Sequence, residues 1–497
     1  MHRETMIQQL TSTPEWDICI IGGGATGLGT AVDATTRGFK TILFDQHDFA
    51  KGTSSRSTKL VHGGVRYLQQ GNIKLVLEAL KERGLLINNA PHLVHNQKFI
   101  VPNYKWWEGP FYGIGLKIYD WMAGKLGLGP SEFLSREETL QLAPTLDPEG
   151  LRGGIVYHDG QFDDARLAID LAQTAASHNG VLLNYFPVTG ILKANKKVCG
   201  VRVKDVFTRN EYEVKSKVVI NATGVFTDIV MNMDNPKHRQ IVTTSQGIHL
   251  VVDKEFLPGD TAIMIPRTDD GRVLFAVPWH NKIVLGTTDT PMKPTDVASL
   301  LEPRPLKEEV DFILKHIGHY LSKDPDRSDI RSMFAGLRPL VKESSKRTAS
   351  LSREHLISLA DSGLITITGG KWTTYRRMAE DVVNFAIEKN KWEKKTCMTA
   401  QLRLFGNDQP AMPPDIFNLK SHELKDAIKR SVSREMCMTT EDFLARRTRS
   451  LLLDAKAAIE HAPVVSSLMA AEMNKDDSWI KEQTENFKLT ANNYLPN

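Results

Sequence analysis

The stretch DICIIGGGATGLGTAVDATTRG, residues 17–38, decides the fold of the first part of the chain. It begins as an apolar strand, breaks at three consecutive glycines and continues with helical spacing, and TILFD supplies a second strand. Gly22, Gly24 and Gly27 give the pattern GxGxxG, in which backbone N–H groups at a helix start approach a pyrophosphate. Asp45, at the end of the second strand, can accept hydrogen bonds from a ribose. The stretch predicts a βαβ unit that binds a dinucleotide, and a structural glycine turn is the less favoured alternative.

The composition is that of a globular protein with large cores. The 497 residues predict two or three domains, and a hydrophobic fraction of 41% excludes a disordered or fibrous chain. The net charge of +4, without long basic runs, gives no support for a nucleic-acid partner. Four cysteines lie far apart without a CxxC pair, which fits a reducing compartment. No apolar run has the length of a spanning helix or a secretory signal, and we expect a cytoplasmic protein with no metal site.

The order of segments predicts a cofactor-binding domain interrupted by a second domain. Residues 164–179 read as a helix, and TAIMIPR, RVLFAVPW and KIVLGTTD then read as antiparallel strands. The segment 364–387 returns to a strand, two glycines and a helix, and a proline cluster follows it. The expected boundaries are 16–100, 150–240 and 340–392 for the cofactor-binding domain, 101–149 and 241–339 for the substrate domain, 393–414 for a linker and 415–497 for a small helical domain.

Two later segments favour FAD over a nicotinamide dinucleotide. KVVINATG at 217–224 is an apolar strand that ends in small residues, and ITITGGK at 365–371 is a strand that ends in two glycines before a helix. FAD binds in an extended form, so its pyrophosphate and its isoalloxazine need separate cradles. The helix start near residues 370–374 would place positive potential beside the flavin, where charge appears on reduction.

Several motifs resemble those of the FAD-dependent glycerol-3-phosphate dehydrogenases in order and spacing. They are GTSSRSTKLVHGGVRYLQQG at 52–71, FDDARL at 162–167, LGTTDT at 285–290, GLRPL at 336–340 and TGGKWTTYRRMAE at 368–380. The resemblance implies oxidation of sn-glycerol 3-phosphate to dihydroxyacetone phosphate, with electrons passed from FAD to a membrane quinone. It also implies an α/β fold: a glutathione-reductase-type, D-amino-acid-oxidase-like FAD domain, a mixed or antiparallel β-sheet substrate domain and a C-terminal helical domain.

The expected cofactor contacts combine the glycine turn with the segments that the resemblance adds. A run rich in hydrogen-bond donors, which contains Ser54, Ser55, Ser57 and Lys59, follows the second strand. This donor-rich run would line FAD, with a solvated loop as the alternative interpretation. The expected cofactor-binding residues are Gly22, Gly24, Ala25, Thr26, Gly27, Asp45, Thr53, Ser54, Ser55, Ser57, Lys59, Leu60, His62, Val188, Ala222, Thr223, Gly224, Gly370, Lys371, Trp372, Thr373 and Thr374.

Oxidation of a phosphorylated secondary alcohol requires a base for the hydroxyl proton and cations for the phosphate. Histidine suits the first task, and His62 and His249 are the candidates. A hydrogen bond to the flavin for His62, and a packed core position for His249, are the alternatives. Guanidinium and ammonium groups suit the second task. The expected catalytic residues are His62, Arg66, His249, Arg338 and Lys371, and the expected substrate contacts are Arg66, Tyr67, His249, Arg338, Arg353, Lys371 and Thr374.

The sequence leaves the partners and the electron acceptor open. KWWEGPFYGIGLKIYDWMAGK at 105–125 mixes aromatic residues and lysines as interfacial segments do, although an aromatic-rich helix and loop packed on its own domain is the favoured interpretation. Contact with the inner face of the cell membrane and a homodimer both remain open. A glycerol-3-phosphate oxidase that uses oxygen, an amine oxidase of the same fold and a non-catalytic flavin-binding scaffold are the competing functions.

Overall fold

Residues 17–38 form the predicted βαβ unit. In this computed structural model, which describes residues 1–65, 68, 71–266, 268–269, 271–293, 296–341 and 355–496, β1 (Trp16–Ile21) runs parallel to β2 (Thr41–Phe44). Helix α2 (Ala25–Thr36) connects them. A Cβ on Gly27 would lie 1.8 Å from the carbonyl oxygen of Gly22, so no side chain fits at this position. The glycine pattern is therefore required by the tightness of the turn.

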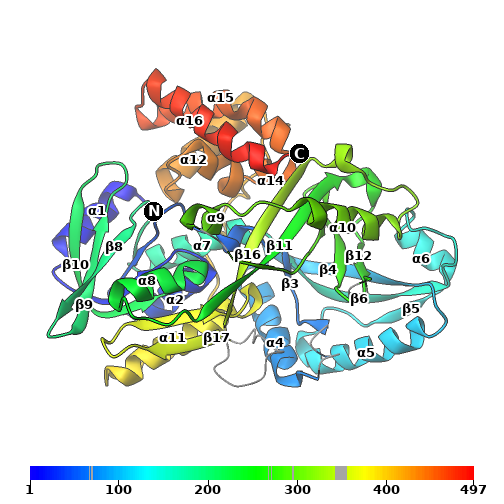
Figure 1. Cartoon of the computed structure of the whole chain (residues 1–497), viewed down its shortest axis with the longest axis horizontal. Coiled ribbons are helices and arrows are strands. Elements are labelled where there is room, and N and C mark those ends of the chain that lie inside the picture. The colour runs from blue at the N-terminus through cyan, green and yellow to red at the C-terminus, as the bar shows by residue number, and fades with distance from the viewer. Residues whose placement is uncertain are drawn as a thin grey trace.

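The first sheet has the strand order β17-β18-β10-β1-β2-β7, with β8 and β9 extending it beside β10 (Figure 1). Strands β18, β10, β1, β2 and β7 are parallel, so their carboxyl ends meet at one edge, and β17 is antiparallel to β18. Helix α2 packs between α7 and α11 on this sheet. The remaining elements of this lobe are α1 (Arg3–Ser12), α7 (Asp164–Ser177), β7 (Val181–Leu183), β8 (Val188–Ala194), β9 (Lys197–Lys204), β10 (Glu211–Asn221), α8 (Thr227–Asp234), β17 (His355–Leu359), β18 (Ile365–Gly369) and α11 (Tyr375–Lys389).

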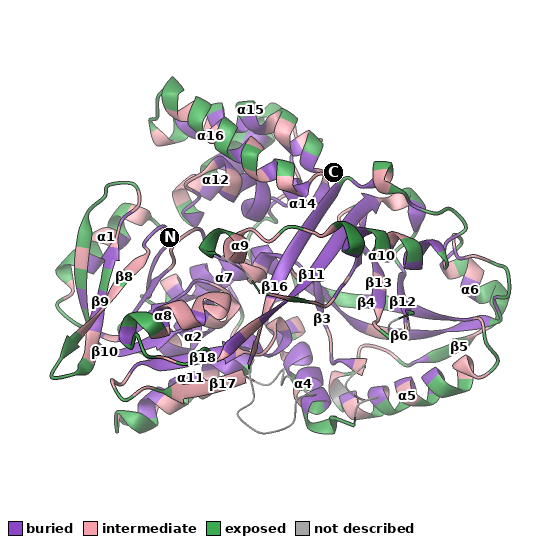
Figure 2. Cartoon of the chain, in the orientation of Figure 1, coloured by how far each residue is buried: buried purple, intermediate pink, exposed green. Residues whose placement is uncertain are grey.

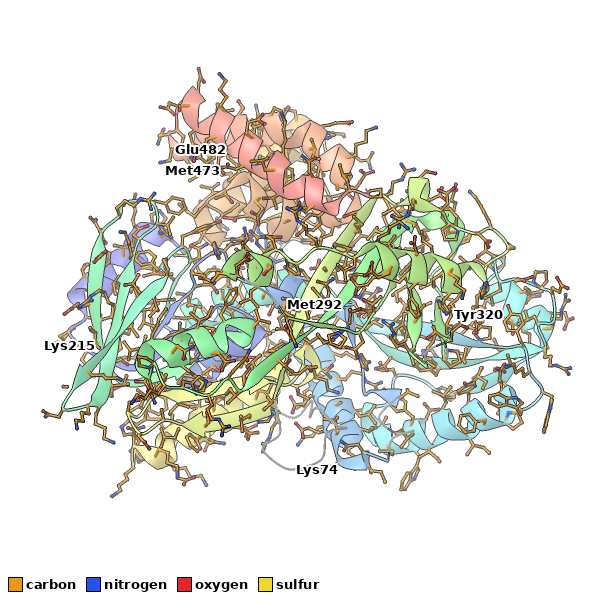
Figure 3. The ribbon with its side chains drawn as sticks, viewed as in Figure 1. Lys74, Lys215, Met292, Tyr320, Met473 and Glu482 are labelled. Carbon is orange, nitrogen blue, oxygen red and sulfur yellow. The ribbon has the colours of Figure 1, made fainter. Side chains whose placement is uncertain are left out.

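The second sheet has the order β15-β11-β14-β13-β12-β4-β6-β3, with β16 beside β11 and β5 beside β6. Strands β11 and β16 cross the middle of the molecule and are mostly buried (Figure 2). Met292, at the end of β15, lies between the two lobes in Figure 3. The elements of this lobe are β3 (Leu60–Val61), α4 (Ile73–Asn89), β4 (Val94–Asn103), α5 (Glu108–Ala123), β5 (Glu132–Leu134), α6 (Arg136–Leu142), β6 (Gly153–Phe162), β11 (Val242–Asp253), β12 (Ala262–Ile265), β13 (Leu274–Trp279), β14 (Lys282–Gly286), β15 (Thr290–Met292), α9 (Val297–Leu301), α10 (Lys307–Gly318) and β16 (Ser332–Val341).

The sheet pairing corrects the domain boundaries expected from the sequence. Strands β3, β6 and most of β4 fall in the segments 16–100 and 150–240 assigned to the cofactor-binding domain, yet they pair in the second sheet. The boundary at residue 100 cuts through β4 itself. Apolar alternation predicts a strand without specifying its partner, and the antiparallel partners β4 and β6 are separated by about fifty residues of sequence, beyond the reach of a local pattern.

The C-terminal helices form a separate layer above the junction of the two lobes (Figure 1). Their core is continuous with the second sheet, because Trp279 and Phe334 belong to the same apolar cluster as Leu451 and Phe487. The elements are α12 (Ser421–Glu435), α13 (Thr440–Asp442), a π-helix (Phe443–Arg447), α14 (Ser450–Leu453), α15 (Ala455–Met473) and α16 (Asp477–Ala491).

Candidate active site

A groove runs from the glycine turn of the first sheet to the face of the second sheet. It consists of a cavity of about 340 Å³ over the carboxyl ends of β1, β10 and β18, and a cavity of about 290 Å³ beside β11 and β16. Thr53, Pro339, Gly370, Lys371 and Trp372 line both cavities. The two cavities are therefore adjacent, and these five residues mark the point where they meet.

The glycine turn is shaped for close approach of a phosphate. Gly24 is the N-cap of α2 and has no side-chain capping bond, so the start of the helix faces the cavity with backbone N–H groups and the positive end of its dipole. A Cβ on Gly22 would lie 2.7 Å from the carbonyl oxygen of Ala222, at the end of the neighbouring strand β10. The residues present therefore fit the pyrophosphate of a dinucleotide.

Asp45 lies in the same cavity, directly after β2. Its Oδ2 accepts a 2.6 Å hydrogen bond from the Gly23 N–H, and its Oδ1 accepts a 2.8 Å bond from the His47 N–H. Burial raises the pKa of Asp45 to about 6, against the two backbone donors, which favour the charged form. Each oxygen keeps acceptor capacity for a ribose hydroxyl.

The predicted cofactor residues divide between the two cavities and the protein beneath them. Those that line the first cavity are Gly22, Gly24, Ala25, Thr26, Asp45, Thr53, Ser54, Val188, Ala222, Thr223, Gly224, Gly370, Lys371 and Trp372. Those that line the second cavity without the first are Ser57, Leu60, His62 and Thr373. Gly27, Ser55, Lys59 and Thr374 line neither cavity.

Lys59 is the clearest departure from the expected arrangement. Its side chain is fully buried, and its Nζ lies 2.8 Å from both carboxylate oxygens of Asp164, at the start of α7. It also donates to the carbonyl oxygen of Ser55. Lys59 therefore anchors the donor-rich run to α7 within the protein interior. Asp164 supplies the paired carboxylate that a buried cation needs.

The second cavity contains the two candidate histidines. His62 is half-buried, and its carbonyl oxygen accepts a 3.4 Å hydrogen bond from the hydroxyl of Thr373, next to the junction of the cavities. His249, on β11, is buried and stacks on Phe334 at a ring-centroid distance of 4.8 Å. Its Nε2 lies 2.9 Å from the hydroxyl of Thr58.

The environment of His249 keeps its imidazole neutral. Burial, followed by the positive charges of Lys59 and Arg338, lowers its pKa well below the ordinary value for histidine. A neutral imidazole at this position can exchange hydrogen bonds with a substrate hydroxyl without carrying a charge.

Arg338 projects into the second cavity from β16. Its Nη2 donates to the hydroxyl of Thr287 at 3.2 Å and to the carbonyl oxygen of Thr288 at 3.1 Å, and its Nη1 lies 3.3 Å from the Asp289 carboxylate. These residues belong to the turn after β14, so the guanidinium is fixed by the strand ends of the second sheet. Lys371 lies at the junction of the two cavities.

Three of the predicted substrate contacts, Arg66, Tyr67 and Arg353, lie outside the described residues. Other polar groups in the groove carry no assignment from the sequence: Arg272 and Asp289 line the second cavity, and His47 and Lys51 line the first. Arg272 follows Gly271 in a hairpin turn and reads as a surface cation in the sequence. Asp289 lies within LGTTDT, one of the motifs that resemble the dehydrogenase family, and this motif is the sequence feature that could have indicated it.

Comparison with known proteins identifies the family. Residues 17–376 match the family described as FAD dependent oxidoreductase, and residues 417–480 match the C-terminal domain of alpha-glycerophosphate oxidase. The mitochondrial glycerol-3-phosphate dehydrogenase of Bos taurus is 39% identical over 99% of this chain and 75% of its own length. The chain belongs to the FAD-dependent glycerol-3-phosphate dehydrogenases.

Solved structures support this membership of the dehydrogenase family. Glycerol-3-phosphate dehydrogenase from Bacillus halodurans, solved with FAD, is 28% identical, with a TM-score of 0.79 over 99% of this chain and 97% of its own. L-α-glycerophosphate oxidase from Mycoplasma pneumoniae has a TM-score of 0.61 at 19% identity over 78% of this chain and 98% of its own, which shows the shared fold. The predicted family, fold class, enzymatic nature and FAD cofactor are confirmed. Within the described residues, no helix combines the length and apolarity needed to cross a bilayer.

Proposed function

We propose that this dehydrogenase oxidises sn-glycerol 3-phosphate to dihydroxyacetone phosphate. The observation that carries the proposal is the second cavity, in which Arg338 and Lys371 bring positive charge beside two histidines, at the junction with the cofactor groove. A cavity of about 290 Å³ suits a small phosphorylated alcohol. The names of the relatives point to the same substrate.

Arg338 is the proposed phosphate anchor. Its bonds to Thr287, Thr288 and Asp289 hold one side of the guanidinium and limit its rotation. Such preorganisation lowers the entropic cost of a charge-assisted bond to phosphate. Lys371 would supply a second positive charge at the junction, where substrate and cofactor meet. Arg66, Tyr67 and Arg353 remain further proposed contacts from the family motifs.

His62 is the proposed base for the substrate hydroxyl. It lines the second cavity, is only half-buried and is tied through its carbonyl oxygen to Thr373. The Nε2 of His249 is engaged by Thr58, and its depressed pKa makes it a weaker proton acceptor, so we assign it to orientation of the substrate. FAD, when bound in the groove, would supply at its N5 the acceptor for the hydride from C2 of the substrate.

The visible spectrum of the holoenzyme under anaerobic conditions tests this function. We expect sn-glycerol 3-phosphate to bleach the flavin absorbance and glycerol at the same concentration to leave it unchanged, because only the phosphate ester engages Arg338 and Lys371. Flavin that stays oxidised with the phosphate ester would contradict the substrate assignment, and bleaching by amino acids would favour an amine oxidase instead.

We propose a membrane quinone as the electron acceptor, supported by an apolar surface along α5. Exposed apolar side chains gather on this helix and the adjacent strand β5, and Trp121 and Trp106 are 83% and 77% exposed. The members of this surface, called the α5 face below, are Trp106, Phe111, Ile114, Ile118, Trp121 and Phe133. Large exposed apolar patches mark interaction sites, and aromatic residues favour the bilayer interface.

Helix α4 adds to the same edge of the molecule. Its apolar residues Ile73 and Leu77 are exposed, at 55% and 46%. Val76 and Leu80 of the same helix are buried. Lys74, the second residue of α4, is also exposed and lies at the lower edge of the molecule in Figure 3. A cation beside apolar residues suits an anionic bilayer surface.

Oxygen is the alternative acceptor, favoured by the match of residues 417–480 to an oxidase C-terminal domain. The two acceptors are distinguished by reoxidation of the reduced enzyme. We expect a soluble quinone analogue to restore the flavin absorbance much faster than air-saturated buffer. Faster reoxidation by oxygen, with formation of hydrogen peroxide, would instead identify an oxidase.

A further inference from the structure

The loop that follows Asp45 contacts the glycine turn at several points. Besides the Gly23–Asp45 bond, the Ala50 N–H donates to the Gly23 carbonyl oxygen at 2.9 Å, and the Ala25 N–H donates to the Ser54 hydroxyl at 2.9 Å. We call residues 45–56 the cofactor loop. Because these bonds reach both Gly23 and Ala25, the position of the cofactor loop sets the geometry of the phosphate-binding turn.

The far side of the cofactor loop is held by the C-terminal helical domain. Arg447 donates from Nη1 and Nη2 to the two carboxylate oxygens of Asp48, at 2.7 and 2.8 Å. Arg446 donates from Nε to the same carboxylate at 2.6 Å. Burial opposes ionisation of Asp48, but the two guanidinium groups outweigh it and lower its pKa to about 2. Asp48 and Arg447 are fully buried, so this contact is shielded from solvent.

A second ion pair joins the same domain to the cofactor groove. Lys51, which lines the first cavity, lies 2.7 Å from Glu441, and Arg446 donates to the other oxygen of that carboxylate at 2.9 Å. Arg446 thus connects Asp48 and Lys51, which are three residues apart in the cofactor loop. Side chains of the C-terminal helical domain, in place of water, therefore surround this short segment of the cofactor loop.

We propose that the C-terminal helical domain is part of the FAD-binding machinery: Arg446 and Arg447 are positioning residues that fix the cofactor loop through Asp48. They do not line either cavity, so they act on FAD only through the loop. The proposal rests on the family's cofactor and is independent of the substrate and the electron acceptor. It also gives the appended domain, which the sequence presents only as a polar helical segment, a specific role.

Thermodynamic reciprocity follows from this arrangement. If the docked domain raises the affinity for FAD by some factor, bound FAD stabilises the docked domain by the same factor. The effect of FAD therefore extends to the backbone around Arg446 and Arg447, away from the groove itself. A domain that merely adds stability would not show this coupling.

The first test measures the Kd of the apoprotein for FAD by flavin fluorescence in the full chain. Arg447→Met removes the bidentate contact but leaves Arg446 and Asn184 bonded to Asp48. We expect its Kd to rise by at least about fivefold, since couplings between sites span about 5- to 150-fold. Arg446→Met is expected to raise the Kd as well, and an unchanged Kd in both folded variants overturns the proposal.

Asp454→Ala is the matched control. Asp454 caps α15 of the same domain by accepting from the Ala457 N–H at 2.9 Å, and it does not touch the cofactor loop. The substitution lowers the stability of the domain without removing a loop contact, so we expect an unchanged Kd for FAD. An equal rise in Asp454→Ala and Arg447→Met would mean that domain stability alone matters, which also overturns the proposal.

Hydrogen exchange on the unmodified protein keeps the proposal testable if the arginine variants do not fold. We expect FAD to slow exchange at residues 443–447 as well as in the cofactor loop, with residues 477–491 of the same domain unaffected. Protection confined to the cofactor loop and the glycine turn would show that the two domains are not coupled, and would refute the assignment.

Discussion

The backbone N–H of Gly23 donates a 2.6 Å hydrogen bond to Oδ2 of Asp45, which ties the glycine turn after β1 to the residue that follows β2. The two parts of the predicted dinucleotide site are thus one hydrogen-bonded unit. The bond also uses one acceptor site of the carboxylate that would bind ribose. Protonation of Asp45 therefore affects both the turn and the ribose contact.

The affinity for FAD is expected to depend on pH through Asp45. Its pKa is raised to about 6, so the carboxyl is protonated below that pH and the ribose acceptor is weakened. Because FAD binding requires the charged form, the Kd for FAD falls as the pH rises, by up to about tenfold per pH unit below pH 6. Titration of the apoprotein with FAD between pH 5 and 7.5 measures this change.

Asp45→Asn removes the titrating group, so the variant should bind FAD more weakly, with a Kd that does not depend on pH in this range. Asp17→Asn serves as the control, because Asp17 pairs with Lys217 at the surface, away from the groove. A pH dependence that persists in Asp45→Asn would assign the effect to another group.

Loss of the guanidinium at position 338 should weaken substrate use. Arg338→Met removes charge-assisted hydrogen bonds to phosphate, which contribute about 1.5–3 kcal/mol, so kcat/KM for sn-glycerol 3-phosphate should fall by about 10- to 150-fold. Steady-state kinetics with a quinone analogue as electron acceptor measure this fall in kcat/KM. Arg331→Met, which removes an exposed arginine paired with Asp253 just before β16, should leave kcat/KM unchanged. Equal losses in both variants would rule out a specific phosphate contact.

The sequence predicted the glycine turn, Asp45 and the second cradle because those features are local. A tight turn requires glycine at fixed spacing, and a strand end followed by a helix start fixes where the backbone donors lie. Side-chain direction in the donor-rich run is not local in this sense. Lys59 reads like its neighbours but turns away from the groove toward Asp164, about a hundred residues later in the chain.

Interdomain contacts were the other feature beyond sequence reasoning. Arg446 and Arg447 lie in the segment that the sequence predicts only as a small helical domain, and both are buried against Asp48. A buried ion pair has no periodic signature, because each partner alone resembles a surface charge.

Replacement of the two histidines should separate base from positioning residue. General-base catalysis contributes about 10²- to 10⁴-fold, so His62→Asn should lower kcat by that range, and His249→Asn should mainly raise KM. His158→Asn, a histidine on β6 that lines neither cavity, is the control. Anaerobic stopped-flow measurement of flavin reduction isolates the step.

The pH profile of flavin reduction offers an independent criterion. A base must be deprotonated, so the rate falls as the pH drops through its pKa. The pKa of His249 lies well below the ordinary value for histidine, owing first to burial and then to Lys59 and Arg338. A rate that stays constant far below pH 6.5, together with a kcat loss in His249→Asn, would reverse the two assignments.

Membrane contact by the α5 face is testable with two substitutions. Trp106→Ser and Trp121→Ser together remove the two most exposed aromatic side chains of that face, while Trp107, which packs on Phe111 and Tyr112, is left in place. We expect the unmodified protein to sediment with liposomes that contain anionic lipid, and the double variant to remain in the supernatant. Its flavin content and its reduction by soluble substrate should not change, because the α5 face lies outside the groove.

Leu489→Ser, which removes a 69% exposed apolar side chain from α16, is the matched control and should retain binding to the liposomes. Equal retention of all three proteins would place any membrane contact elsewhere, and no retention of the unmodified protein would leave a soluble acceptor as the partner of the reduced enzyme.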